Sequence, residues 1–288
     1  MKIPHIASDW KILFKPEKTG NYVNDHCIVK HFDGKWHLFG ITSFLGGAPN
    51  ERYFAHGVSS SLGEQMEEQR KEIDRGTLAW APGIITENGN HYMFYGPSPT
   101  SLAISFDMYE WYNYAVKLNN EPPMAAHRDH FILKLGENRF LMYVVGTKDR
   151  RSCVSLFTSE NLLEWDFHGY ALTSGEDAPL SPPWGAMESP FVVCKDGLYY
   201  LFLTYTDCSE ENYHNTLVFV SSDPYSFGEY NGEKGGSVPV AKLFAHAPEV
   251  IFDGEEWYIT TCGWNGYKGV PNPGAVSIAR LEWREEHK

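Results

Sequence analysis

The feature that most constrains the fold of this chain is a segment that recurs five times. Each copy contains a short apolar strand, a turn rich in Gly, Asp or Asn, and a second strand of alternating aromatic and aliphatic residues. Pairs such as Asp33-Gly34 and Asn88-Gly89 favour hairpin turns, because both central residues of a type I′ turn take positive φ. The repeat therefore predicts five β-hairpins, whose copies begin at Asp25, Ala81, Asp129, Glu188 and His246.

The stretches after the hairpins extend the repeat into units of three or four strands. Examples are SLAISF from Ser101 and TLVFVSS from Thr216, and the units recur roughly every 50 to 60 residues. Helical periodicity is almost absent, and strand units of this length favour radial repetition over a sandwich. We predict an all-β, five-bladed β-propeller that forms a single domain over residues 1–288. The strand Trp10–Phe14 has no hairpin of its own, so the N-terminal strand is predicted to close the last blade.

Composition and charge narrow the class of partner. The 37 acidic residues against 24 basic residues give a formal charge of -13, which repels phosphate backbones and anionic lipids. Neither nucleic acid nor a membrane is therefore an expected partner. The five cysteines show no CxxC spacing, and no metal or other cofactor is expected. The N-terminus lacks a secretory apolar run, which predicts a cytoplasmic protein or a secreted one whose leader has been removed.

The repeat also locates candidate chemistry. Counting back eleven residues from the first aromatic of each second strand reaches Asp25, Ala81, Asp129, Glu188 and His246. The first strand of each propeller blade lines the central channel, so we expect three carboxyl groups to converge at one mouth. Clustered carboxyls raise one another's pKa, which does not favour stability. The cluster suits glycoside cleavage, in which one carboxyl donates a proton and a second attacks or activates water.

Structural interpretations of the same residues remain open. Each acid can instead sit in a turn between blades and accept backbone hydrogen bonds, as Asp often does. For His246, a buried hydrogen-bonding role and a substrate-binding role have equal support. Aromatic residues near the predicted mouth are candidates to stack on sugar faces or to pack between blades: Tyr22, Trp80, Trp184, Tyr205 and Trp264. Of these, Trp80 and Trp184 are the preferred substrate-binding candidates, because each precedes an inner strand.

Several of these segments carry a resemblance to a known group of enzymes. Asn24-Asp25-His26, Trp80-Ala81-Pro82-Gly83, Arg128-Asp129-His130 and Met187-Glu188-Ser189-Pro190 resemble hallmark positions of the five-bladed propeller glycoside hydrolases of families 43 and 32. The resemblance spans about Asn21 to Trp283. His26, His130 and Ser189 depart from the family 32 pattern, and the Trp-Ala-Pro and Glu-Ser-Pro strings are similar to family 43.

The resemblance implies roles for individual residues. Asp25 is then the base of an inverting enzyme or the nucleophile of a retaining one, and Glu188 is the general acid. Asp129 orients sugar hydroxyls and adjusts the pKa of the acid, and Arg128 and Asn24 bind substrate. The expected function is hydrolysis of a furanoside or pentoside linkage in a small-molecule or oligosaccharide substrate, such as an arabinofuranoside or xyloside, with inversion preferred.

Three alternative functions remain. One is a retaining β-fructosidase-like hydrolase, and another is a carbohydrate-binding propeller without catalysis, because one fold hosts many functions. The third is phosphorolysis, which needs a basic pocket for phosphate, with Arg128, Arg150 and Arg151 as candidates.

Overall fold

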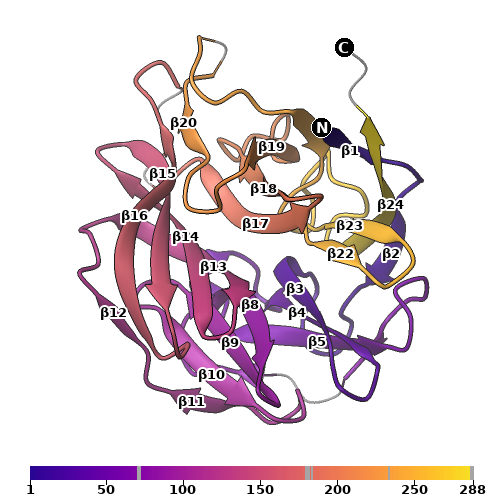
Figure 1. Ribbon diagram of the computed structural model, residues 1–288. Helices are drawn as coiled ribbons and strands as arrows, with labels where there is room; N and C mark the ends of the chain where they lie inside the picture. Colours follow the sequence, from indigo (N-terminus) through magenta and orange to yellow (C-terminus); the bar gives the residue numbers. More distant parts are fainter. Residues whose placement is uncertain (70–72, 179–181, 183, 233, 286–288) are drawn as a thin grey trace.

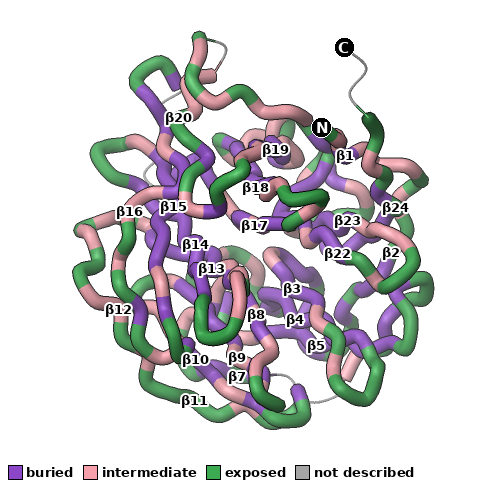
Figure 2. The backbone as a smooth tube through the Cα atoms, viewed as in Figure 1, coloured by how far each residue is buried: buried purple, intermediate pink, exposed green. Residues whose placement is uncertain are grey.

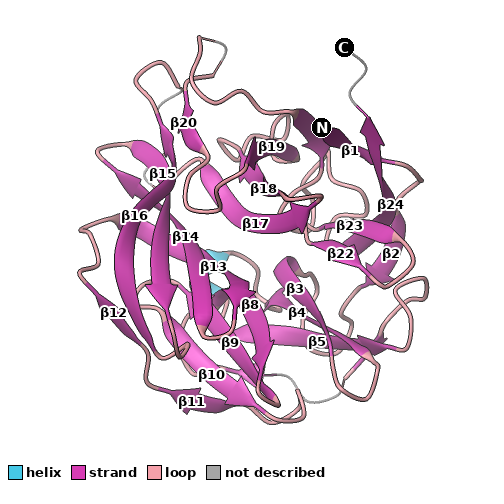
Figure 3. Ribbon diagram, viewed as in Figure 1, coloured by secondary structure: helices cyan, strands magenta, loops and turns pink. Residues whose placement is uncertain are grey.

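The computed structural model describes residues 1–69, 73–178, 182, 184–232 and 234–285. Its strands form five sheets with mostly antiparallel pairing, arranged around a common centre, and the N- and C-terminal strands lie side by side (Figure 1). Strands dominate the described residues, and the single helical element among them is the short 3-10 helix η1 (Ala48–Asn50) (Figure 3). Within the described part of the chain, no helix is long and apolar enough to cross a membrane. The predicted all-β five-bladed propeller is confirmed.

Each of the first three blades is built on one of the predicted hairpins. Blade 1 contains β3 (Asn24–Lys30), β4 (Trp36–Thr42), β5 (Tyr53–Ser59), β6 (Glu67–Glu68) and β7 (Ile73–Asp74). Blade 2 contains β8 (Trp80–Glu87), β9 (Asn90–Gly96), β10 (Ser101–Ser105) and β11 (Tyr112–Tyr114). Blade 3 contains β13 (Ala125–Gly136), β14 (Arg139–Lys148), β15 (Arg151–Ser159) and β16 (Glu164–Ser174), with β12 (Lys117–Asn119) and β20 (Gly228–Tyr230) parallel to β16.

The last two blades show how the ring closes. Blade 4 contains β17 (Met187–Lys195), β18 (Leu198–Tyr205), β19 (Asn215–Ser221) and β21 (Ala241–Phe244). Blade 5 contains β22 (Val250–Phe252), β23 (Trp257–Thr261), β24 (Val276–Glu285), β1 (Lys2–Ile6) and β2 (Lys11–Phe14). Both N-terminal strands pair with β24. The predicted closure by the N-terminal strand is confirmed, because the first and last segments of the chain share one sheet.

The apolar core lies between the blades. Five clusters of buried side chains each draw on two neighbouring blades. Phe14 and Leu38, for example, join blades 5 and 1, whereas Phe94 and Trp165 join blades 2 and 3. The hairpin turns and the outer loops are largely exposed, as Figure 2 shows. Because packing occupies the interfaces, the inner strands are free to present polar side chains to the centre.

Candidate active site

Every inner strand carries the same backbone irregularity at or just before its start. In β3, Asn24 pairs with Ile41 and His26 with Gly40, so Asp25 is an extra residue in a β-bulge with φ of 33°. A left-handed residue recurs at the equivalent position in or just before each inner strand, at Asp25, Ala81, Asp129, Ser189 and Ala247. Bulges re-aim side chains and are common next to active sites. This irregularity turns the entry of each inner strand toward the mouth of the channel.

In two blades the equivalent residue lies one position away from the one that the sequence repeat predicted. The residue equivalent to the bulged aspartates of blades 1 and 3 is Ser189 in blade 4, whereas the repeat had pointed to Glu188. In blade 5 the equivalent residue is Ala247, whereas the repeat had pointed to His246. Glu188 and His246 therefore precede the left-handed residue of their blade by one position. That residue lies in a bulge in blade 4 and just before β22 in blade 5. The three acids come from two adjacent rings around the mouth and do not share a single ring.

Hairpin length explains the offset. In blade 1, Lys30 pairs with Trp36 across the turn, whereas in blade 4 Cys194 pairs with Tyr199. The blade 4 connection is therefore one residue shorter. Counting back eleven residues from Tyr199 consequently reaches Glu188, one residue before the bulged Ser189. Blade 5 has the same shorter connection, since Phe252 pairs with Trp257.

The two rings meet in one cavity of about 370 Å³. Its wall includes the five residues that immediately precede the bulges, one from each blade: Asn24, Trp80, Arg128, Glu188 and His246. Asp25, Asp129 and Trp184 also line it. The structure thus brings together all eight residues that the sequence predicted for the site.

Arg128 is the cation at the centre of the acidic group. Its Nη2 donates to Oε1 of Glu188 at 3.0 Å, and its Nε lies 3.6 Å from Oδ2 of Asp129. Its Nη1 donates to the backbone carbonyls of Ala126 and Trp184, at 3.0 and 2.6 Å. The guanidinium is therefore held from both sides, and it fixes the position of one carboxyl oxygen of Glu188 while balancing two negative charges.

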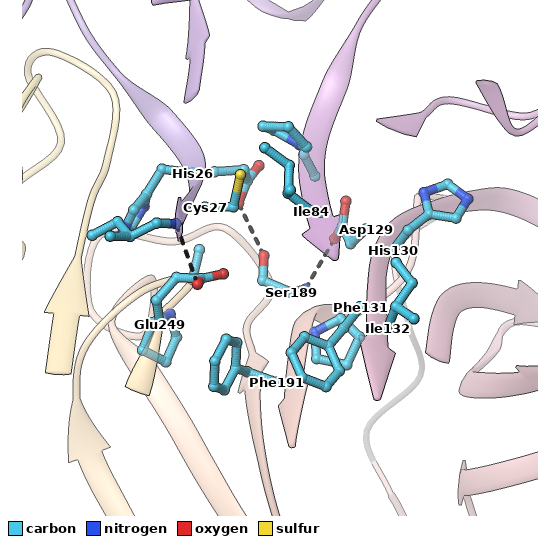
Figure 4. Close-up of a pocket in the computed structure, with 18 residues that line it drawn as sticks. His26, Cys27, Ile84, Asp129, His130, Phe131, Ile132, Ser189, Phe191 and Glu249 are labelled. Carbon is cyan, nitrogen blue, oxygen red and sulfur yellow. Dashed lines mark hydrogen bonds between the residues drawn. The ribbon is translucent and has the colours of Figure 1, made fainter. Parts of the chain in front are cut away.

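Ser189 links the two bulged aspartates. Its hydroxyl donates to Oδ1 of Asp25 at 2.9 Å, and its backbone N–H donates to Oδ2 of Asp129 at 3.0 Å. Figure 4, a close-up of a neighbouring cavity that is also lined by Asp25 and Asp129, shows Ser189 lying beside Asp129. One residue thus fixes both carboxyls. Serine at position 189 departs from the family 32 sequence pattern, and its hydroxyl supplies a hydrogen-bond donor.

Burial and mutual repulsion change the acidity of the aspartates. Burial, followed by the charges of Asp129 and Glu188, holds the pKa of Asp25 well above its usual range, although the Ser189 hydroxyl opposes this shift. Burial also raises the pKa of Asp129 to about 6, against the lowering effect of Arg128. The two groups therefore differ in the partner that opposes burial, which is a cation for Asp129 and a hydroxyl for Asp25.

Asn24 and His246 complete the polar wall. Asn24 donates from Nδ2 to Oδ2 of Asp25 at 3.3 Å, while its own oxygen accepts from the Tyr213 hydroxyl at 3.2 Å. Nδ1 of His246 bonds the carbonyl of Tyr213 at 2.8 Å, and its Nε2 lies 4.0 Å from Oδ1 of Asp25. Burial lowers the pKa of His246, which favours the neutral imidazole. His246 is therefore both a buried hydrogen-bonding residue and a residue of the cavity wall.

The predicted aromatic residues divide into two groups. Trp80, Trp184 and Trp264 line the cavity, and Trp184 is largely exposed. Tyr22 is buried behind the wall, with its hydroxyl on Glu51, and Tyr205 packs in the core between blades 3 and 4. Only the first group is placed to stack on a sugar, and Tyr22 and Tyr205 serve packing and hydrogen bonding.

Sequence reasoning missed several residues of the wall. They come from loops between strands and carry no repeat signal: Glu51, Cys208, Tyr213 and Tyr267. Glu51, which follows η1 in the connection between β4 and β5, is a fourth carboxyl in the cavity. A loop residue of this kind has no counterpart in the other blades, so comparing repeats does not reveal it.

Ion sites other than the Arg128 cluster have little support in the described residues. No group of three or more His, Cys, Asp or Glu side chains among them has the geometry to hold a metal ion. The cavity also has few basic residues for the phosphate site that phosphorolysis needs. Arg151 donates to the carbonyls of Gly175, Glu176 and Ala178, and of the three candidate arginines only Arg128 lines the cavity.

Comparison with known proteins places this arrangement in a family. Residues 14–258 match the model of the glycosyl hydrolases family 32 N-terminal domain. The chain belongs to glycosyl hydrolase family 32. Among curated proteins, no sequence matches this family 32 chain.

Solved structures share the propeller fold of this family 32 chain. A Bombyx mori family 32 β-fructofuranosidase has a TM-score of 0.65 and 19% identity over 98% of this chain, which spans 62% of that enzyme. A Cellvibrio cellulosa α-L-arabinanase in complex with arabinohexaose has a TM-score of 0.67 and 16% identity over 94% of this chain and 95% of its own. An exo-1,5-α-L-arabinanase from a bovine ruminal metagenomic library has a TM-score of 0.61 and 18% identity over 94% and 99%.

Proposed function

We propose that the chain is a glycoside hydrolase acting on a furanoside, with a β-fructofuranoside as the first candidate substrate. The observation that carries the proposal is the presence of Asp25, Asp129 and Glu188 in one cavity together with Arg128. The family 32 match and the likeness to a β-fructofuranosidase support the fructoside. Residues 1–288 are proposed to act as one catalytic domain.

The proposed chemistry divides between two carboxyls. Glu188 gives its proton to the glycosidic oxygen, so the bond from that oxygen to the anomeric carbon breaks as the leaving alcohol departs. Asp25 attacks the anomeric carbon in a retaining enzyme, and water then releases the sugar with Glu188 as base. The family match favours this retaining course over the inversion expected from the sequence, in which Asp25 activates water directly.

The remaining predicted residues support this chemistry. Asp129, held by Ser189 and Arg128, is proposed to accept hydrogen bonds from sugar hydroxyls and to adjust the pKa of the general acid. Asn24 and His246 stand on either side of Asp25, where their polar atoms are suited to the sugar near the reacting carbon. Trp80 and Trp184 are proposed to stack on the sugar and on the leaving group.

An arabinofuranoside is the second candidate substrate. The chain spans 95% and 99% of the two arabinanases, compared with 62% of the β-fructofuranosidase. In addition, His26, His130 and Ser189 depart from the family 32 sequence pattern. These observations favour testing arabinofuranosides, together with the xyloside that the sequence also suggested.

A substrate panel tests the proposal. We expect the protein to hydrolyse sucrose or a 4-nitrophenyl arabinofuranoside, and NMR of the first sugar released distinguishes retention from inversion. Glu188→Gln should reduce turnover by about 10²- to 10⁴-fold while leaving sugar affinity largely intact. If the protein cleaves no glycoside but binds sugars, and Glu188→Gln changes only their affinity, the carbohydrate-binding alternative replaces the enzyme. If turnover depends on added phosphate, phosphorolysis replaces hydrolysis.

A further inference from the structure

We infer that Glu51 is a substrate-binding residue, whose second carboxyl oxygen accepts a hydrogen bond from one ring hydroxyl of the sugar held beside Asp25. This inference rests on the proposed function and adds a specificity determinant to it. Glu51 is 2% exposed and lines the cavity. It follows η1, outside the repeated strands, so neither the repeat nor the motif segments pointed to it.

Two donors fix the first carboxyl oxygen of Glu51. The Tyr22 hydroxyl donates to Oε1 at 2.8 Å, and the Trp264 indole N–H donates to the same oxygen at 3.0 Å. Tyr22 precedes β3, whereas Trp264 follows β23, so the two donors reach Glu51 from opposite sides of the blade 1 to blade 5 boundary. The backbone is fixed as well, because the Glu51 carbonyl accepts from the N–H of Ala79 at 3.0 Å. The carboxyl is therefore held rigidly before any ligand binds.

The second carboxyl oxygen is the one available to a ligand. None of the described residues donates a hydrogen bond to Oε2 of Glu51. This oxygen is also not among the polar atoms that are enclosed without a partner. Since Glu51 lines the cavity, its free oxygen opens onto the cavity, where a sugar hydroxyl can donate to it.

A purely structural role does not account for a carboxyl at this position. One neutral carbonyl oxygen would accept from both Tyr22 and Trp264, so the bonds observed do not require an acid. Burial raises the pKa of Glu51, which means that enclosing its charge is unfavourable in the free protein. An unfavourable buried acid in a cavity wall is explained when a ligand provides the missing donor.

The location of Glu51 indicates which part of the sugar it meets. Glu51 and Asp25 line the same cavity, and the charge of Glu51 contributes to the raised pKa of Asp25. A sugar positioned for attack by Asp25 therefore presents a hydroxyl to Glu51. A carboxylate accepts hydrogen bonds and cannot donate them. The inference consequently predicts selection for a hydroxyl at one ring position and rejection of a group that only accepts.

The variant Glu51→Gln distinguishes a hydrogen bond to the sugar from a purely structural role of Glu51 in the cavity wall. The indole N–H can only donate, so the amide oxygen must stay with Trp264 and the amide NH₂ must face the cavity. We would measure kcat/KM of both proteins for the best substrate of the panel and for its monodeoxy and monodeoxyfluoro analogues. For the parent substrate we expect a loss of about 10- to 100-fold in Glu51→Gln. On one deoxy analogue the two proteins should be equal within about twofold, because the bond is absent in both.

The fluoro analogue at the same position sharpens the test. Fluorine accepts but does not donate, so it should favour Glu51→Gln over the wild-type protein, in contrast to the parent substrate. Inductive effects of fluorine act on both proteins and cancel in the ratio. A similar loss for the parent and for every analogue would overturn the inference, as would no loss for the parent.

Two controls complete the design. Glu249→Gln makes the same substitution at a half-buried carboxyl outside this cavity, and it should leave kcat/KM unchanged. Thermal unfolding of each variant establishes that it folds. If the wild-type protein cleaves no glycoside, the proposed function fails, and calorimetric binding of fructose and arabinose then decides the inference. Weaker binding to Glu51→Gln would support it, whereas equal binding or no binding would overturn it.

Discussion

Two neighbouring cavities of the propeller have two wall residues in common but differ in their chemistry. Asp25 and Asp129 line both the candidate active site, of about 370 Å³, and a lower cavity of about 150 Å³. The upper cavity adds Arg128 and Glu188, whereas the lower one adds Ser189, Glu249 and apolar inner-strand residues (Figure 4). Both cavities therefore contain buried acids, and only the upper one contains a cation.

The partners of each acid account for the difference. Glu249 accepts one long hydrogen bond, 3.4 Å from the N–H of Ile28, and burial raises its pKa to about 8. Glu249 is therefore neutral at pH 7. Asp129 has Arg128 and the Ser189 N–H beside it, and its pKa reaches only about 6. Burial without a cation thus favours the protonated acid, whereas Asp129 has Arg128 from the upper cavity and the N–H of Ser189, which lines the lower one.

The largest predicted effect follows from removing the charge of Asp25. Asp25→Asn should lower kcat/KM by several orders of magnitude for every substrate of the panel, because attack on the anomeric carbon is lost whatever the leaving group. Glu249→Gln provides the matched change in the lower cavity and should retain activity. Equal losses in the two variants would show that the cavities do not differ as described.

A smaller effect is predicted for the link between the two aspartates. Ser189→Ala removes the hydroxyl that lowers the pKa of Asp25, so that pKa rises further. Activity that requires ionised Asp25 should then fall at a higher pH, and the acidic limb of the kcat/KM profile should move upward. At pH values on that limb we expect a loss of about 10-fold. Ser221→Ala, at the last residue of β19 and outside the cavity wall, serves as the control, and an unmoved limb would contradict the role of Ser189.

The smallest effect concerns stability in the lower cavity. The pKa of Glu249 is about 8 in the folded protein and 4.5 in the reference state, so the folded protein binds the extra proton between these values. Its contribution to stability is present below pH 4.5 and is lost as the pH rises toward 8. Glu249→Gln removes this loss. The Tm of the variant minus that of the wild-type protein should therefore increase by a few degrees from pH 5 to pH 8. Parallel Tm curves would contradict this account.

Glu68 offers a contrast of opposite sign for that measurement. Its carboxylate accepts from the N–H groups of Glu17, Lys18 and Thr19, which lower its pKa. Its contribution to stability is present above the usual glutamate pKa and is lost only at lower pH. Glu68→Gln should therefore be less stable than the wild-type protein throughout pH 5 to 8.

The fold was predictable because the repeat encodes it locally. The turns rich in Gly, Asp or Asn and the alternating second strands identify five hairpins from sequence alone, and the unpartnered strand at Trp10–Phe14 indicates the closure. The β-bulges were not predictable in the same way. One extra residue in a strand, or one residue fewer in a turn, leaves the apolar pattern almost unchanged but shifts Glu188 and His246 by one position.

The site was predictable to the extent that its residues follow the repeat. The three acids precede or occupy the bulges, so the count of eleven residues found them despite its error of one residue in blade 4, whereas Arg128 was predicted from the family resemblance. Glu51 and Tyr213 lie in connections of differing length, where no repeat constrains their position. Their approach to the cavity depends on tertiary contacts such as the Trp264 bond to Glu51, which sequence patterns do not contain.

The most direct test of the central claim is the leaving-group dependence of Glu188→Gln. If Glu188 protonates the departing oxygen, the variant should lose about 10²- to 10⁴-fold in kcat/KM on an alkyl furanoside. It should lose far less on the 4-nitrophenyl furanoside, because nitrophenolate departs without a proton. A loss of the same size on both substrates would contradict the assignment of Glu188 as the acid in this cavity.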